Sequence, residues 1–93
     1  MFSLFKVQGT SMLPTLASGD FVIASQLFFS LRPGDLVVVH HPSYRRIVKR
    51  ISRVSKDKQL WLVGDHASSV LPEEMGWIDA KKVHAKVLFT VNK

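Results

Sequence analysis

Apolar and polar positions in this chain follow a period of two, in short segments divided by turn residues. Residues 36–40 (LVVVH) form a continuous apolar run, which is typical of a strand covered on both faces. Residues 83–91 (VHAKVLFTV) alternate, which predicts a strand with one apolar face. That face consists of Ala85, Val87, Phe89 and Val91.

Further strands are indicated by β-forming residues and by the turns between them. We expect them at residues 5–8, 21–25, 46–54 and 59–63. Residues 32–35 (RPGD) predict a turn, residues 56–58 (KDK) a hairpin, and residues 12–18 a helical turn or a loop. The pattern contains no long amphipathic helix. It therefore predicts a mostly β fold, with residues 1–93 forming a single small domain of twisted antiparallel strands.

The period of two also places a lysine on an apolar face. Lys49 lies between Ile47 and Ile51, which point to the same side of the expected strand. Burial there would lower the pKa of the amine, and an uncharged amine can act as a general base. Alternatively, the Lys49 side chain extends along the sheet and keeps its ammonium group in water.

A second stretch, residues 8–16 (QGTSMLPTL), holds a candidate nucleophile. Pro14 restricts the backbone and Gly9 permits close approach, so the hydroxyl of Ser11 can be held in one place. The alternative is an ordinary turn before a proline. A serine hydroxyl needs a base to become a good nucleophile. A triad with one of the four histidines is not excluded by composition, but a Ser11–Lys49 dyad explains both stretches at once.

Composition narrows the function classes. The chain has 93 residues, is 46% hydrophobic and has no cysteine, which excludes disulfides, a cysteine nucleophile and thiolate metal sites. No cofactor or metal is expected, and no apolar run approaches the roughly 18 residues of a membrane span. The net charge of +6 favours acidic partners, but the basic residues are not interleaved with aromatic ones, so specific nucleic-acid binding is not expected.

Four segments resemble the conserved boxes of the type I signal peptidase family, in the family's order. Residues 9–16 resemble its nucleophile box, residues 34–39 (GDLVVV) its strand box, residues 47–51 (IVKRI) its general-base box and residues 64–66 (GDH) the start of its last box. The likeness spans roughly residues 7–89. It implies the peptidase fold that signal peptidases share with LexA-type repressors.

The resemblance implies a role for six residues. Ser11 would be the acylating nucleophile, with its backbone N–H donating to the oxyanion, and Lys49 would be the general base. Gly9 stands where some members carry a further oxyanion donor, and Ser69 would replace the serine that orients the lysine amine. Met12 and Leu13 would contact the substrate. The implied activity is a serine endopeptidase that removes a leader or propeptide by acyl-enzyme chemistry.

Two departures from the family suggest a specialised member. The usual N-terminal membrane anchor is not expected here, and residues 68–75 (SSVLPEEM) stand in place of the usual Asp-Ser-Arg. A short member without an anchor resembles the maturation protease of nickel-type superoxide dismutase, which trims a propeptide.

The expected location is cytoplasmic, or alternatively peripheral at a membrane. A set of large apolar residues forms either part of the core or an exposed rim with weak contact to a membrane or partner. The set consists of Phe2, Leu4, Phe5, Phe28, Phe29 and Leu31.

Other functions remain open from the sequence. A β-domain with a degenerate last box would bind peptide or protein without cleaving it. A LexA-type domain would cleave itself, but only ten residues precede Ser11, so this outcome is not expected. A nucleic-acid-binding module ranks last, and the pattern carries no signal for an oligomeric state.

Overall fold

The computed structural model describes residues 2–7, 12–28, 30–41, 45–66 and 76–92. The described elements are β1 (Phe2–Lys6), β2 (Phe21–Ser25), β3 (Leu36–His41), β4 (Arg45–Val54), β5 (Gln59–Val63), β6 (Ile78–Asp79), the 3-10 turn η1 (Ala80–Lys82) and β7 (Val83–Val91). All seven strands form one sheet, and each neighbouring pair is antiparallel. The mostly β fold predicted from the sequence is confirmed.

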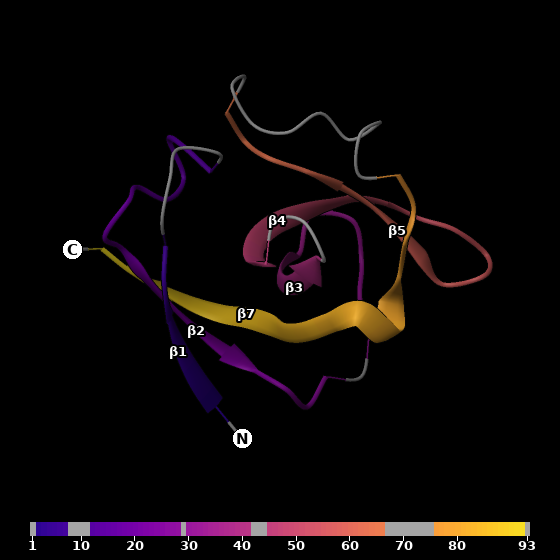
Figure 1. Ribbon diagram of the computed structural model, residues 1–93, viewed down its shortest axis with the longest axis horizontal. Helices are drawn as coiled ribbons and strands as arrows, with labels where there is room; N and C mark the ends of the chain where they lie inside the picture. The colour runs from indigo at the N-terminus through magenta and orange to yellow at the C-terminus, as the bar shows by residue number, and fades with distance from the viewer. Residues whose placement is uncertain (1, 8–11, 29, 42–44, 67–75, 93) are drawn as a thin grey trace.

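The strand order is β1-β2-β7-β3-β4-β5-β6, so the last strand in sequence lies inside the sheet. β7 pairs with β2 on one side and with β3 on the other. It is therefore the strand that joins β1 and β2 to the rest of the sheet (Figure 1).

The sheet is strongly curled (Figure 1). β1 and β4 are separated by three strands in the sheet order. Nevertheless, the guanidinium carbon of Arg46 in β4 lies 5.8 Å from the centroid of the Phe5 ring in β1. The curl therefore brings two distant strands to opposite sides of one concave surface.

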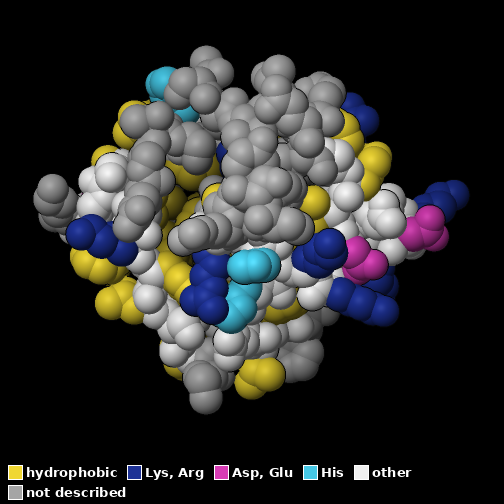
Figure 2. Space-filling model, in the orientation of Figure 1, with side chains coloured by type: hydrophobic (Ala, Val, Ile, Leu, Met, Phe, Trp, Pro, Cys, Tyr) yellow, Lys and Arg dark blue, Asp and Glu magenta, His cyan; other side chains and the backbone are white. Residues whose placement is uncertain are grey.

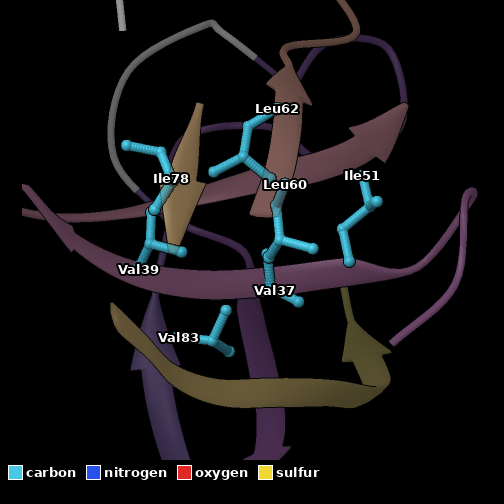
Figure 3. Packing of buried hydrophobic residues seen from close by; sticks show 7 residues of the cluster. All are labelled: Val37, Val39, Ile51, Leu60, Leu62, Ile78 and Val83. Atoms are coloured by element: carbon cyan, nitrogen blue, oxygen red, sulfur yellow. The ribbon is translucent and has the colours of Figure 1, made fainter. Parts of the chain in front are cut away.

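The sheet is packed on both faces by two clusters of buried side chains. Cluster 1 consists of Val37, Val39, Ile51, Leu60, Leu62, Ile78 and Val83, which point toward one another in Figure 3. Cluster 2 consists of Val7, Met12, Leu16, Val22, Ala24, Val38 and Ala85. Successive residues of β3 contribute to different clusters, because side chains alternate between the two faces of a strand. This confirms that residues 36–40 form a strand covered on both faces.

The prediction of a single apolar face on β7 is wrong in its second half. Val87 packs against cluster 2, but Phe89 is 65% exposed. The cause is a β-bulge, because Ala24 of β2 pairs with Val87 while Ile23 pairs with Phe89, leaving Leu88 as an extra residue. A bulge shifts the alternation by one position and turns the following side chains to the other face.

The first strand also differs from its prediction, because it covers Phe2–Lys6 instead of residues 5–8. Phe2 and Leu4 are 68% and 62% exposed, so of the two alternatives left open by the sequence they form an exposed rim. Phe28 instead packs against cluster 1. Among the described residues, no helix has both the length and the apolarity needed to cross a membrane.

The fold predicts unequal effects for two leucine substitutions. Leu60 is fully buried in cluster 1, so Leu60→Ala should lower the free energy of unfolding by roughly 2–5 kcal/mol. Leu27 is 73% exposed, and Leu27→Ala should change it by no more than about 0.5 kcal/mol. Urea unfolding followed by tryptophan fluorescence measures both values. Equal losses in the two variants would contradict the assignment of cluster 1 as core.

Candidate active site

The Lys49 side chain is buried in the middle of β4. It lies opposite Val37 of β3 and on the same face as Ile47 and Ile51, which pack in or against cluster 1. Only 2% of Lys49 is exposed. The burial predicted from the sequence is therefore present, and the alternative in which the ammonium group reaches water does not hold.

The Lys49 amine has unusual surroundings for a lysine. Its Nζ atom has no hydrogen-bond partner within the part of the chain that the structure describes. Burial removes water from the ammonium form, and this desolvation lowers the pKa of Lys49 below its ordinary value. The amine can therefore lose its proton more easily than the amine of an exposed lysine, and an uncharged amine can act as a general base.

A carboxylate ties the neighbour of Lys49 to two other parts of the chain. Arg50 donates from Nε and Nη2 to the two carboxylate oxygens of Asp65, at 2.9 and 2.8 Å. Thr15 donates from Oγ1 to the same carboxylate at 2.6 Å. Arg50 also donates from Nη1 to the carbonyl oxygen of Gly34 at 2.9 Å. One guanidinium and one carboxylate thus connect all four segments that carry the family resemblance.

These bonds shift the pKa of the carboxyl group. The hydrogen bonds from Arg50 are the main reason that the pKa of Asp65 lies below its ordinary value of 3.8, and the hydrogen bond from Thr15 adds to the shift. Both partners stabilise the ionised form. The Asp65 side chain is 16% exposed, so water screens the ion pair less than it would at the surface.

The other residues implied by the resemblance are only partly described. Ser11, Gly9 and Ser69 lie outside the described residues, and their roles stay predictions. Met12 is 1% exposed and packs in cluster 2, so its side chain offers almost no surface to a substrate. Leu13 is half-buried, which leaves it as the better of the two predicted substrate contacts.

Two strands near Lys49 have backbone edges that could receive a further strand. β1 is an edge strand of the sheet, and β4 pairs with β5 only from Arg50 onward within the described residues. The Arg46 side chain spans from β4 to the Phe5 ring of β1. An extended polypeptide can bind such an edge through main-chain hydrogen bonds. The sequence pattern does not indicate this arrangement, because it depends on the curl of the whole sheet.

No group of three or more metal-ligating side chains lies together among the residues that the structure describes. The arrangement around Lys49 instead suits proton transfer to and from a hydroxyl or an amine.

Comparisons with known proteins relate the chain to peptidases. The family described as "Peptidase S24-like" matches residues 2–87, which is nearly the whole chain. The protein named "Signal peptidase I" from Bacillus caldolyticus is 34% identical to this chain over 61 residues, which cover 62% of this chain and 34% of that relative. The matched part thus spans about a third of the relative's length.

The Asp65 ion pair predicts a pH-dependent loss of stability. Because the pKa of Asp65 is lower in the folded protein, its contribution is complete above the ordinary value of 3.8 and is lost as the pH falls toward the folded pKa. Asp65→Asn should therefore lower the free energy of unfolding by roughly 1–3 kcal/mol at pH 7 and by much less near pH 2.5. Urea titrations at both pH values measure the difference. Asp57→Asn, in the exposed hairpin, serves as the control.

The buried amine predicts the opposite pH trend. Because the pKa of Lys49 is lowered by folding, the unfolded chain binds more protons, and stability should rise as the pH increases toward 10.5. Lys49→Met removes this dependence, so the variant should be more stable than the wild type at pH 7, and the difference should shrink at alkaline pH. Lys56→Met, at an exposed position, should keep the wild-type slope. Parallel pH–stability curves for Lys49→Met and the wild type would show that Lys49 stays charged.

Proposed function

Because this chain belongs to the Peptidase S24-like family, we propose that it is a serine endopeptidase with Ser11 as nucleophile and Lys49 as general base. One observation carries the proposal, namely a lysine amine that is 2% exposed and has no hydrogen-bond partner among the described residues. A buried amine without a carboxylate partner is expensive to keep charged. Its retention is explained if the uncharged form performs chemistry.

The proposed reaction has two halves. In the first, the Ser11 hydroxyl attacks the scissile carbonyl carbon, its proton passes to Lys49 Nζ, and the tetrahedral oxyanion is bound by the Ser11 backbone N–H. Collapse of this intermediate breaks the C–N bond, and Lys49 returns the proton to the leaving amine. In the second half, Lys49 accepts a proton from water while the water oxygen attacks the acyl carbon. The C–O bond to Ser11 then breaks, Lys49 returns the proton to the Ser11 oxygen, and the acid is released.

Residues beyond the dyad have proposed supporting roles. Arg50 adjoins Lys49 in the chain and Thr15 follows Ser11 by four positions, and both are bound by Asp65. Asp65 therefore acts as a positioning residue that keeps the two catalytic segments together. Ser69 is proposed to hydrogen-bond the Lys49 amine in the active enzyme. Because Gly9 has no side-chain hydroxyl, the oxyanion is proposed to be bound by backbone donors.

The proposed substrate is a protein with an N-terminal leader or propeptide. Such a segment is extended before cleavage, and it can pair with the edge of β1 or β4 while small side chains enter pockets beside Leu13. The propeptide of a nickel-type superoxide dismutase is the specific candidate from the subfamily resemblance. A cytoplasmic location and a weak membrane contact through Phe2 and Leu4 remain predictions.

Cleavage of leader-bearing precursors tests the dyad. Precursors that include nickel-type superoxide dismutase are incubated with the wild type, and the products are read by mass spectrometry. Ser11→Ala, Lys49→Met and Lys49→Arg should each lower the cleavage rate by at least about 10³-fold, because the first removes the nucleophile and the others remove a base. Ser18→Ala and Lys56→Arg are the matched controls and should retain the full rate.

The same assay separates this function from its alternative. Precursor that binds tightly to the wild type without being cut would favour a peptide-binding domain. Cleavage that persists in Ser11→Ala would exclude Ser11 as nucleophile. Circular dichroism of each variant shows that any loss of rate is not a loss of fold.

A further inference from the structure

A basic cleft lies where the end of β3 meets η1 and the start of β7. Its volume is about 400 Å³, and it is lined by His40, Lys81, Lys82, Val83 and His84. The two lysines are exposed, whereas Val83 is buried and forms the apolar base. Figure 2 shows histidine side chains next to Lys or Arg side chains near the centre of one face, over β3 and β7. The cleft therefore gathers cations around a small concave surface.

None of the described residues that line this cleft carries a carboxylate. Asp65 and Asp35 form ion pairs with Arg50 and Lys86, and these two pairs do not involve Lys81 or Lys82. Asp79 is close in sequence, but its carboxylate accepts a hydrogen bond from the backbone N–H of Lys81 at 2.9 Å. Within the described residues, neither Lys81 nor Lys82 forms an ion pair with a carboxylate, which favours an anionic ligand.

The cleft is continuous with the strands proposed to bind substrate. His40 lies opposite Arg46 in the β3–β4 register, and the Arg46 guanidinium lies over the Phe5 ring of β1. Phe5 in turn packs edge-on against His84, with ring centroids 5.6 Å apart. An unbroken set of contacts therefore runs from the cleft to both β1 and β4.

We propose that this cleft binds acidic side chains of the polypeptide substrate, three to five residues from the scissile bond. The inference rests on the proposed peptidase function. Arg46 and Lys49 are three positions apart on β4, which is roughly 10 Å in a strand. An extended substrate along β4 covers this distance in the same number of residues. The odd spacing turns the Arg46 and Lys49 side chains to opposite faces of β4, and an extended substrate alternates in the same way. Acidic side chains on the face shared by Arg46 and His40 would therefore point toward the cleft while the scissile bond lies at Lys49.

Other anions fit the cleft less well. Single-stranded nucleic acid is bound through aromatic platforms on which bases stack, and the described residues that line the cleft include no phenylalanine, tyrosine or tryptophan. A lipid surface contacts protruding side chains, whereas Val83 at the base of the cleft is 8% exposed. A short acidic peptide segment matches both the small concave shape and the link to β4.

Binding of matched peptides to Ser11→Ala tests the inference without depending on cleavage. The probes are fluorescein-labelled 12-residue peptides with a small-residue centre and with Glu-Glu, or Gln-Gln in the matched peptide, placed four residues to either side. In fluorescence anisotropy, one Glu-Glu peptide should bind about 3- to 10-fold more tightly than its Gln-Gln counterpart. Lys81→Gln/Lys82→Gln should remove this preference. Lys56→Gln/Lys58→Gln, with the same change in net charge, should keep it.

Several outcomes would overturn the cleft assignment. These are equal binding of all peptides, a preference that survives Lys81→Gln/Lys82→Gln, or stronger competition by a dT12 oligonucleotide or by phosphatidylglycerol vesicles than by the Glu-Glu peptide. The proposed function fails separately. If the preference for Glu-Glu holds but the wild type cuts neither these peptides nor the leader-bearing precursors, the cleft is a peptide site on a protein that is not a peptidase.

Discussion

The ion pair between Arg50 and Asp65 holds distant parts of this chain together. Asp65 follows β5 and Arg50 lies in β4. Asp65 also accepts a hydrogen bond from Thr15, and Arg50 also donates one to the carbonyl oxygen of Gly34. A guanidinium paired with a carboxylate through two bonds fixes both distance and orientation. Because Lys49 is next to Arg50, the position of the buried amine follows from this ion pair as well as from the packing of β4.

Lys49 and Arg50 show how one strand handles two cations in different ways. Side chains alternate along β4, so the guanidinium points to a side where a carboxylate meets it, and the amine points into apolar side chains. The charged form of Arg50 is stabilised by Asp65, whereas burial lowers the pKa of Lys49. Adjacent positions of β4 thus supply Arg50, which links distant segments, and Lys49, which loses its proton more easily than an exposed lysine does.

Much of the fold and the burial of Lys49 could be predicted from the local pattern of apolar and polar residues. A period of two was sufficient to place Lys49 on an apolar face, and a continuous apolar run was sufficient to indicate that β3 is covered on both sides. The bulge at Leu88 was not predictable, because it depends on how β2 and β7 pair across the sheet. The contact between Arg46 and Phe5 and the cleft around Lys81 likewise arise from the curl of the sheet. For Arg50, the only indication of a role in the sequence was its position in residues 47–51 (IVKRI), which resemble the general-base box.

The interior position of β7 has a consequence for how the protein is made. β1 and β2 have no strand partner in common with β3 to β6 until β7 is present, because β7 alone borders both groups. A ribosome releases β7 last of the described strands, so the two groups cannot join into one sheet until β7 has been synthesised. The segment that follows Ser11 packs with β2, and Lys49 lies in β4. The sheet that carries the hydrolytic centre proposed here is thus complete only after translation has passed residue 91.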